Sequence, residues 1–479
     1  MSDPRNILQS KFSDGNRYAN FGNALVQIHI KGFRCHQNTL VDIKCPITAF
    51  CGLNGTGKST ILQLVAVSCK NTIGRSFYLR DFFVVGTLDP APYQRDARVV
   101  YKFWQKDRTH KQLTLSRSLM RWSGYARRPR KSIFFAGVGV FLPKIEKRDF
   151  SVYQARLLKV DSEKAVGGQI KSASSRILGR QYDQMRSCHV SCGHRASDIL
   201  VVDRGGASYS EAHMGFGEGR AAYLVAVLET LPDKSLVLIE EPETSLHPSA
   251  QHELGKFLMD VSIRKGHQIF LTTHSEYLLR ALPSAARIFL YQDAEILRQI
   301  HGLTASEATS LMTEGHDKAL NVLVEDDCAK AIVTEMIRQH DSSFLQTISV
   351  TTAGDHNSIR TTIRCLNDSP IQVAAVLDGD QQPEPKKNIF ALPGPKPPEK
   401  ELFSKKKVCE YLRQRYGIVW EDYYAGRGLH SVDHHEWISG LAKHLSVEKE
   451  SLTRELARVY AETQDCATLT NLLKEAISR

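Results

Sequence analysis

A glycine-rich stretch has the residue types and the spacing that bind the phosphates of a nucleotide. Residues 52–60 read Gly-Leu-Asn-Gly-Thr-Gly-Lys-Ser-Thr, which fits the pattern G-x-x-x-x-G-K-[ST]. Glycines allow a tight turn whose backbone N–H groups approach phosphate, and the lysine reaches the β- and γ-phosphates. The predicted nucleotide contacts are Gly52, Asn54, Gly55, Thr56, Gly57, Lys58, Ser59 and Thr60. The pattern predicts ATP binding together with Mg²⁺, which the Ser59 hydroxyl would ligate.

Two adjacent carboxylates supply the second half of this predicted site. They are Glu240 and Glu241, and they follow an apolar run at 236–239. Such a run is typical of a strand buried in a parallel sheet, and α/β proteins place their sites at the carboxyl ends of those strands. We expect Glu240 to hold Mg²⁺ through water and Glu241 to polarise the attacking water. The pair predicts hydrolysis of the bound nucleotide.

A second set of carboxylates follows two apolar runs in the last third of the chain. Glu325 comes after the run 319–324, and Asp378 and Asp380 come after the run 373–377. Two parallel strands that deliver acids to one edge of a sheet can build a Mg²⁺ site for phosphoryl transfer. The sequence therefore predicts a second metal site, distinct from the nucleotide site.

The elements that must position these groups are those of an α/β protein. Residues 46–50 read as a buried strand before the glycine loop, and 61–67 read as the helix after it. Residues 24–50 read as a strand pair that includes 26–30, whereas 82–85 and 98–104 read as strands of an antiparallel sheet. Residues 268–273 read as another buried strand. A strand, a glycine-rich turn and a helix N-terminus together direct N–H groups at polyphosphate.

The composition is that of a globular protein with an excess of cations. The chain has 479 residues, a formal charge of +11 and a pI near 9.1, which suits a polyanionic partner such as DNA. Six cations and two aromatic residues lie between residues 117 and 131, where they could contact nucleic acid or form a solvated hairpin tip. Ten scattered cysteines, the lack of a signal peptide and the lack of a long apolar run predict a cytoplasmic protein without a membrane contact.

The carboxylate motif also carries a family resemblance. The motif at 240–248 has the sequence Glu-Glu-Pro-Glu-x-x-Leu-His-Pro. This sequence resembles the corresponding motif of ABC/SMC-like ATPases, in particular the OLD (overcoming lysogenisation defect) family and related Septu- and PARIS-like anti-phage ATPases. The resemblance implies that Glu240 is the Walker B carboxylate and that Glu241 is the catalytic base. It also implies that His274 is a switch histidine that senses the γ-phosphate.

The same resemblance implies an assembly. Gly215 and Gly217 open a helix at the position of the family's signature motif, which contacts ATP across a head-to-head dimer. The sequence around these glycines departs from the usual Ser-Gly-Gly of the signature motif. A glycine-rich helix N-terminus can nevertheless bind an anion. We therefore expect a homodimer, or a higher oligomer, formed through the ATPase heads.

The last third resembles a Toprim domain in the order and spacing of its acids. The resemblance implies that Glu325, Asp378 and Asp380 are metal ligands. One departure bears on activity, because Asp326 replaces the usual glycine and Ala329 stands where OLD-type nucleases carry a second acid. An active nuclease and a Toprim-shaped domain kept for structure or docking stay equally open.

The resemblances predict a domain organisation. The expected fold is an ABC/SMC-type P-loop ATPase head at 1–310, a Toprim-like α/β domain at 311–400 and a helical C-terminal region at 401–479. The head carries a partly helical insertion at about 72–200, of which we expect 152–195 to be mostly helical.

A polar group marks a probable helix start in the helical region. It consists of His430, Asp433, His434, His435 and Glu436. Asp433 is suited to an N-cap with the histidines solvated. If the histidines do more, they would dock a partner or line the acidic site.

Three functional hypotheses follow. The first is an ATP-hydrolysing sensor of an anti-phage system that controls a nuclease effector on a separate subunit. The second is a self-contained OLD-type nuclease that cleaves DNA under ATPase control. The third is an SMC- or RecF-like DNA-repair ATPase without nuclease activity. Nicking of DNA by the purified protein alone separates the second from the other two.

Overall fold

The computed structural model describes residues 3–118, 121–137, 144, 149–293, 296–315, 317–366 and 371–478. The chain divides into two compact units, Met1–Ala308 and Thr309–Arg479, which we call unit 1 and unit 2. Both contain sheets covered by helices, which confirms the predicted α/β class. Among the helices formed by the described residues, none is long and apolar enough to cross a lipid bilayer.

The central sheet of unit 1 has six strands in the order β17-β16-β3-β15-β14-β9. The strands are β3 (Ile47–Gly52), β9 (Ile133–Ala136), β14 (Leu236–Glu240), β15 (Gln268–Thr272), β16 (Arg287–Asp293) and β17 (Ile296–His301). All neighbouring pairs are parallel except β16 with β17. Every residue of β3 and β15 is buried, as parallel strands covered on both faces require. Only β15 separates the strand before the glycine loop from the strand that ends in the paired carboxylates.

Helix α3 (Lys58–Val67) lies between this sheet and a second, antiparallel one. The second sheet has the order β2-β1-β5-β6-β7, with β1 (Leu25–Phe33), β2 (His36–Asp42), β5 (Tyr93–Trp104), β6 (His110–Ser118) and β7 (Arg121–Ser123). Side chains of α3 and of both sheets share one hydrophobic core. The Tyr101 hydroxyl of β5 donates to the Leu64 carbonyl oxygen of α3 at 2.7 Å. The other helices here are α1 (Pro4–Lys11), α2 (Arg17–Phe21), α4 (Leu79–Phe82), α8 (Pro248–Lys265) and α9 (Glu276–Ala281).

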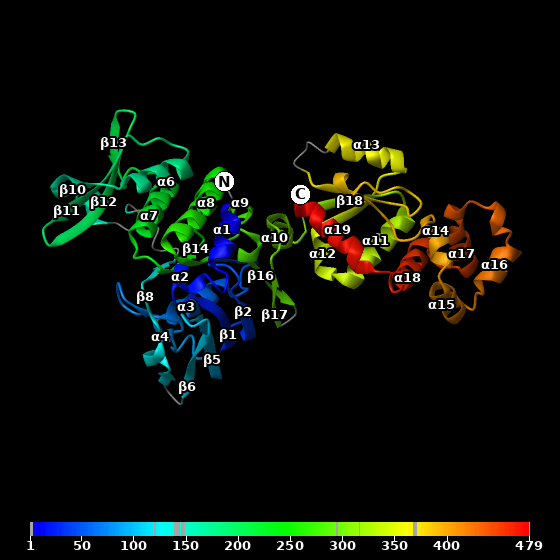
Figure 1. Cartoon of the computed structure of the whole chain (residues 1–479), viewed down its shortest axis with the longest axis horizontal. Coiled ribbons are helices and arrows are strands. Elements are labelled where there is room, and N and C mark those ends of the chain that lie inside the picture. Colours follow the sequence, from blue (N-terminus) through cyan, green and yellow to red (C-terminus); the bar gives the residue numbers. More distant parts are fainter. Residues whose placement is uncertain are drawn as a thin grey trace. The chain divides into compact units, whose positions relative to one another are not determined.

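The prediction that residues 152–195 are mostly helical is wrong. The structure has a four-stranded antiparallel sheet formed by β10 (Lys159–Ala165), β11 (Gln184–Cys192), β12 (Arg195–Arg204) and β13 (Ala207–Ser210). One helix, α6 (Gly168–Leu178), interrupts it between β10 and β11, beside α7 (Phe216–Thr230) (Figure 1). All seven side chains of β10 are exposed, so no alternation of apolar and polar residues marks this strand in the sequence.

Unit 2 is built on a parallel sheet in the order β19-β18-β20-β21. Its strands are β18 (Leu320–Val324), β19 (Ile348–Thr352), β20 (Val373–Leu377) and β21 (Ile389–Ala391). Helix α13 (His356–Leu366) packs Ile359 and Ile363 against Ala375 and Leu377 on one face. Helix α11 (Asp327–His340) covers the other face (Figure 1). The sheet and its helices thus bring the ends of β18 and β20 side by side.

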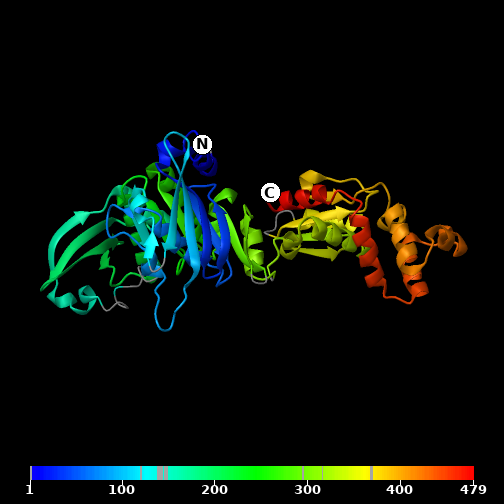
Figure 2. The same cartoon turned by 90° about the horizontal axis from the view of Figure 1, so that it is seen from below.

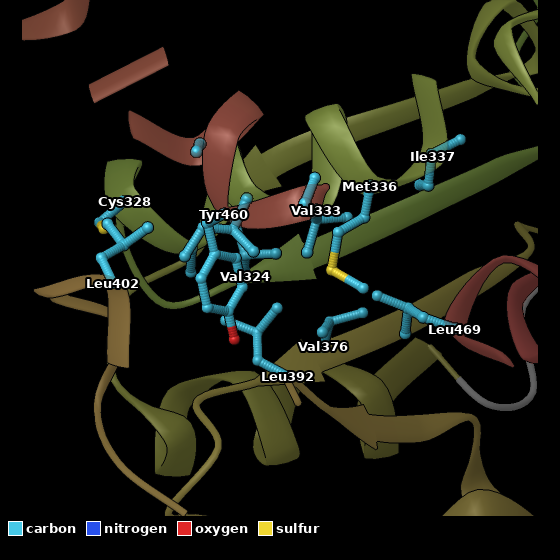
Figure 3. Packing of buried hydrophobic residues seen from close by; sticks show 14 of the residues in the cluster. Val324, Cys328, Val333, Met336, Ile337, Val376, Leu392, Leu402, Tyr460 and Leu469 are labelled. Carbon is cyan, nitrogen blue, oxygen red and sulfur yellow. The ribbon is translucent and has the colours of Figure 1, made fainter. Parts of the chain in front are cut away.

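The helices that follow residue 400 share a core with this sheet. Figure 3 shows Val324 and Val376 of the strands packed with Tyr460 and Leu469. Helix α19, drawn in red, lies along the sheet of unit 2 (Figure 2). The helices of unit 2 not yet named are α12 (Ser342–Thr347), α14 (Pro398–Phe403), α15 (Lys406–Tyr416), α16 (Trp420–Gly426), α17 (Trp437–Leu445), α18 (Lys449–Ala461) and α19 (Cys466–Ser478). The chain passes from unit 1 to unit 2 within α10 (Ala305–Met312).

Candidate functional site

The glycine loop connects β3 to α3, as its sequence predicts, and its tight packing requires glycine at two positions. At Gly52 the φ angle is 136°, and a Cβ atom there would lie 2.1 Å from the Leu290 carbonyl oxygen. At Gly57 the φ angle is 81°, and a Cβ atom would lie 2.3 Å from His36 Nε2. A side chain at Gly52 would force the backbone of β16 away, and one at Gly57 would displace the buried His36 ring. The loop conformation is therefore fixed by its neighbours.

Lys58 folds back over the loop that it follows. Its Nζ donates to the carbonyl oxygens of Gly52 at 2.8 Å and of Leu53 at 2.9 Å. Burial lowers the pKa of Lys58, and the nearby Glu241 carboxylate opposes this shift. Among the remaining predicted nucleotide contacts, the exposed ones are Asn54, Gly55 and Ser59, and the buried ones are Thr56 and Thr60. An ammonium held above exposed backbone is well placed to meet a polyphosphate.

Glu240 ends β14 level with Phe50, two residues before the end of β3. It pairs in register with Thr272 of β15, which in turn pairs with Phe50. One of its carboxylate oxygens, Oε1, is buried and has no hydrogen-bond partner among the described residues. A buried carboxylate oxygen is costly without a partner, and a hard cation such as Mg²⁺ is the partner that this position suits. The residues present therefore fit the predicted metal.

The structure brings the two predicted catalytic residues together. His274 Nε2 lies 3.4 Å from Glu241 Oε1. Burial, followed by the charge of Glu243, raises the pKa of Glu241 above its usual range. Burial, followed by the charge of Lys58, lowers the pKa of His274. The site therefore holds an acid that ionises near neutral pH beside an imidazole that stays neutral.

Glu243, which the sequence reasoning left without a role, positions His274. It is buried, and its Oε1 accepts the Thr273 hydroxyl at 2.5 Å and the backbone N–H of His274 at 3.0 Å. The loop that carries Glu241 is thereby attached to the end of β15. Glu243 is the third glutamate of the motif at 240–248, and its place in that motif was the sequence signal that could have indicated a functional role.

His36 and Arg220 are two further contributors that the sequence reasoning missed. His36 is buried, accepts the Thr39 hydroxyl at Nδ1 and donates from Nε2 to the Gly57 carbonyl oxygen, each over 3.1 Å. Burial lowers the pKa of His36 to about 4, so the ring is neutral. Arg220 is also buried and donates to the carbonyl oxygens of Glu240, at 3.3 Å, and Glu241. Nothing in the local sequence of either residue marks this supporting role.

Gly215 and Gly217 lie in a hollow apart from the glycine loop. The hollow has a volume of about 760 Å³ and contains no residue of the segment 52–60. Gly215 is the N-cap of α7, and a Cβ atom on Gly217 would lie 2.2 Å from the Ser245 carbonyl oxygen. The first turn of α7 therefore packs directly on the loop that follows the paired carboxylates.

Glu218, in the same turn of α7, connects this helix to the insertion. Its side chain is buried and accepts hydrogen bonds from Arg180 at 3.0 Å, Tyr182 at 2.6 Å and Tyr209 at 2.8 Å. These donors belong to the segment after α6 and to β13. The insertion is thus anchored on the helix that carries Gly217.

In unit 2 the structure brings the predicted acids to one edge of the sheet. The backbone N–H of Asp378 donates to Glu325 Oε1 at 3.0 Å. The Asp378 carboxyl group is buried, and its Oδ1 has no hydrogen-bond partner within the described part of the chain. Burial, followed by the charge of Glu325, raises the pKa of Asp378 to about 8. Asp380 accepts a hydrogen bond from its neighbour Gln381 at 3.3 Å. Two of the three acids are thus in direct contact, and the third contributes to the raised pKa.

Two further acids, Asp326 and Glu399, lie near Asp378 and contact His435. His435 Nδ1 is 3.4 Å from Asp326 Oδ2 and 3.5 Å from Glu399 Oε1. Asp326, which replaces the glycine of the expected motif, is the N-cap of α11 and accepts the Ala329 backbone N–H. The predicted N-cap at Asp433 is confirmed. His435 contacts Asp326 and Glu399, which are not among the predicted metal ligands. No sequence signal marks Glu399.

The proline-rich loop before α14 is what places Glu399 here. A Cβ atom on Gly379 would lie 2.2 Å from the Gly394 carbonyl oxygen, so the loop packs closely on the turn between Asp378 and Asp380. The Tyr460 hydroxyl of α18 donates to the Pro393 carbonyl oxygen at 3.0 Å and holds the loop from the other side. Helix α14 begins after Pro397 and carries Glu399 in its first turn.

The basic segment at 117–131 is partly internal. Arg128 and Lys131 are buried and donate to backbone carbonyl oxygens, at 2.7 Å to Phe77 and at 3.2 Å to Phe21. The exposed cations are Arg121, Arg127 and Arg130. Residues 119–120 of this segment lie outside the described residues. Fewer cations are therefore available to a nucleic acid than the sequence suggests.

Comparisons with known proteins bear on unit 1. Residues 96–280 match a family model described as "AAA domain, putative AbiEii toxin, Type IV TA system", and residues 27–83 match another described as "AAA domain". Unit 1 carries an AAA-type ATPase domain. The two matches include the glycine loop, the paired carboxylates and His274. No protein of curated function matches the chain.

Three solved structures of SMC heads are similar to the chain. The SMC head domain from Thermotoga maritima has 15% identity and a TM-score of 0.36, covering 58% of this chain and 98% of that one. An SMC head bound to the C-winged helix domain of ScpA has 14% identity and a TM-score of 0.39, covering 58% and 96%. The SMC head derived from Pyrococcus furiosus, bound to the C-terminal domain of ScpA, has 12% identity and a TM-score of 0.37, covering 60% and 98%.

Proposed function

We propose that the chain is an ATP-hydrolysing sensor subunit of a bacterial anti-phage defence system, and that it controls a nuclease effector carried by a partner protein. The observation that carries the ATPase part is geometric: the glycine loop with Lys58 and the Glu241–His274 pair, whose atoms approach to 3.4 Å, follow three neighbouring strands of one sheet, β3, β14 and β15. The defence part is supported by the resemblance to OLD-type, Septu-like and PARIS-like ATPases. The matched family whose description names an AbiEii toxin agrees with it.

Each group has a distinct part in the proposed hydrolysis. The backbone of the glycine loop and Lys58 bind the phosphates, and Glu241 accepts the proton of the attacking water. A base is most effective when its pKa lies near the working pH, which is the direction in which burial moves Glu241. Mg²⁺, held by Ser59 and Glu240, would stabilise the negative charge that develops on the phosphates. His274 stays neutral beside Glu241 and can hydrogen-bond a phosphate oxygen or the water.

The proposed active assembly is a cytoplasmic homodimer of ATPase heads, or a multiple of it. It is supported by the position of Gly215 and Gly217, which line a hollow separate from the glycine loop of the same chain. A helix N-terminus in that hollow can receive the phosphates bound by a second copy. The exposed Arg121, Arg127 and Arg130 support an interaction with DNA.

Steady-state ATP hydrolysis by the purified protein tests the proposed ATPase. We expect Glu241→Gln to lower kcat at least about 100-fold while ATP binding is retained, because only the base is removed. Lys58→Ala should abolish ATP binding. Lys256→Ala, which removes an exposed ammonium paired with Glu253, is the matched control and should leave both unchanged. Full activity of Glu241→Gln would contradict the assigned base.

A second candidate function is that the chain itself cleaves DNA at the acidic edge of unit 2. The observation that favours it is the buried Asp378 Oδ1, which has no hydrogen-bond partner in the described ranges and lies beside Glu325. Carboxylate oxygens of this kind suit Mg²⁺ or Mn²⁺ and phosphoryl transfer. Under this second candidate function, residues 311–400 act as a Toprim-like nuclease domain.

Plasmid nicking by the purified chain with Mg²⁺ or Mn²⁺ and ATP separates the two candidates. Nicking that disappears in Asp378→Ala/Asp380→Ala, but not in the control Asp422→Ala at an exposed position of α16, assigns the nuclease to this chain. Hydrolysis of ATP with intact DNA assigns the cleavage to a partner protein.

A further inference from the structure

Next to the acidic edge of unit 2, three potential metal ligands converge from elements that the predicted metal site does not use. Glu399 comes from the first turn of α14, and His434 and His435 come from the short helix η7 (His434–Glu436). One ligand atom from each lies within 4.8 Å of the other two. Glu399 is 35 or more positions before the two histidines in the sequence. The fold therefore brings the three side chains together.

The burial of Glu399 is the observation that points to a ligand. Glu399 is 3% exposed, and its Oε2 has no hydrogen-bond partner among the residues that the structure describes. Its other oxygen lies 3.5 Å from His435 Nδ1. A carboxylate oxygen buried in this way costs several kcal/mol unless a proton, a cation or a donor satisfies it. Among the described residues, the basic side chain that lies within 4.0 Å of the Glu399 carboxylate is His435, and no lysine or arginine does so.

We propose that Glu399, His434 and His435 bind a divalent transition-metal ion, with Asp326 completing the ligand set. Asp326 Oδ2 lies 3.4 Å from His435 Nδ1, so it borders the same space. Two imidazoles with two carboxylates suit Zn²⁺ or Mn²⁺, whereas Mg²⁺ prefers oxygen ligands alone. Ligand atoms about 2.1 Å from one tetrahedral ion lie about 3.4 Å apart. The three ligand atoms lie within 4.8 Å of one another, so binding requires them to move closer.

The proposed ion lies beside the metal site formed by Glu325, Asp378 and Asp380. Asp326 follows Glu325 directly, and the charges of Asp326 and Glu399 both act on Asp378. The family pattern would place a second acid at Ala329, which cannot bind metal. Glu399 and the histidines supply ligands from the other side of the same edge. The inference deepens the second candidate function and rests on it for the role of the ion, whereas metal binding itself requires no DNA cleavage.

Mn²⁺ binding to the chelator-treated full-length protein tests the proposal, with pulsed electron paramagnetic resonance as the readout. Coordinated imidazole nitrogen gives a coupling to the Mn²⁺ spectrum that carboxylates cannot give. We expect this coupling in the unmodified protein, and its loss together with one Mn²⁺ equivalent in His434→Ala/His435→Ala. Glu399→Gln, which keeps the shape and removes the charge, should weaken the nitrogen-coupled Mn²⁺ at least about 10-fold.

His430→Ala, on the neighbouring turn, is the matched control and should retain the coupling. Asp378→Asn should also retain it, because that residue belongs to the adjacent site. Absence of nitrogen coupling in the unmodified protein, or its persistence in the His434→Ala/His435→Ala variant, overturns the proposal. Nitrogen-coupled Mn²⁺ without any DNA nicking leaves this site standing and removes the nuclease function instead.

Discussion

At the residue scale, the nucleotide site of unit 1 depends on buried groups that fix the protonation of their neighbours. Glu241 and His274 are in contact, and burial shifts their pKa values in opposite directions, each toward the neutral form. Glu243 adds a second negative charge and holds the backbone of His274. The geometry of the base therefore depends on a neighbouring carboxylate that is buried.

Glu243→Gln is expected to lower kcat for ATP hydrolysis about 10- to 100-fold with little change in KM. The amide keeps the volume but weakens the hydrogen bonds that position His274, and small misplacements of catalytic groups have effects of this size. Steady-state kinetics at saturating ATP measure it. Glu276→Gln, which disturbs only the ion pair with Arg280 on α9, is the control. A loss confined to KM would show that Glu243 acts on nucleotide binding instead.

His36, which packs on the glycine loop, makes the stability of the folded protein depend on pH. Its pKa in the folded protein is about 4, against about 6.5 in an unfolded chain. Between these values the unfolded chain binds a proton that the folded protein does not, so the free energy of unfolding falls as pH is lowered from about 6.5 to 4. The contribution of His36 is about 3 kcal/mol at most. Above pH 6.5 His36 is neutral in both states, so this loss of stability is absent.

His36→Gln should therefore flatten the pH dependence of unfolding between pH 4.5 and 7, as measured by urea denaturation. His267 is also buried, and burial lowers its pKa to about 4, so it gives both proteins a pH dependence of the same sign. The test is therefore the difference between the two slopes of unfolding free energy against pH. An identical slope in the variant and the unmodified chain would mean that His36 does not titrate as its burial implies.

At the element scale, the first turn of α7 connects three parts of unit 1. Gly217 packs on the loop after the paired carboxylates, Glu218 binds the insertion, and Arg220 binds the carbonyl oxygens of Glu240 and Glu241. A displacement of this turn would be transmitted to the carboxylates of the nucleotide site.

Gly217→Ala should reduce ATP hydrolysis about 10- to 100-fold and leave ATP binding intact. The new Cβ atom would lie 2.2 Å from the Ser245 carbonyl oxygen, so the turn must move, whereas the glycine loop is untouched. Gly219→Ala is the matched control on the same helix, because its Cβ atom would approach nothing closer than 3.8 Å. Equal activity of the two variants would rule out a role for this close packing.

The elements that build both sites could largely be predicted from the sequence. Strands β3, β14, β15, β18 and β20 are mostly apolar, as buried parallel strands require, although Thr48, Gln268 and Asn321 interrupt the pattern. Each strand ends at a predicted site residue or within two residues of one. Strand β10 could not be predicted, because its side chains are all exposed and only backbone hydrogen bonds define it. Glu399 and His435 reach the acidic edge through the close packing of Gly379 on the proline-rich loop. No periodicity in the sequence encodes such a contact.

At the scale of the whole molecule, two cores stabilise two sets of chemical groups. The nucleotide site lies on the central sheet of unit 1, and the acidic edge belongs to unit 2, whose strands and later helices share one core. Under the proposed function, ATP acts on unit 1 and its effect reaches unit 2 or a partner through the assembly of heads.

ATP should convert the protein to a dimer when hydrolysis is blocked. We expect Glu241→Gln with Mg²⁺ and ATP to double the molar mass measured by size-exclusion chromatography with light scattering, because an intact ATP can join two heads. Lys58→Ala under the same conditions should keep the mass that it has without nucleotide. An unchanged mass for Glu241→Gln would contradict an ATP-dependent head-to-head assembly.

The anchoring of the insertion by Glu218 also limits how this protein can diversify. Its buried carboxylate is satisfied by Arg180, Tyr182 and Tyr209, all of which belong to the insertion or to its last strand. An insertion exchanged for a different one, in evolution or in the laboratory, would leave this carboxylate without donors inside unit 1. The insertion and the first turn of α7 must therefore change together, and a functional chimera has to transfer both.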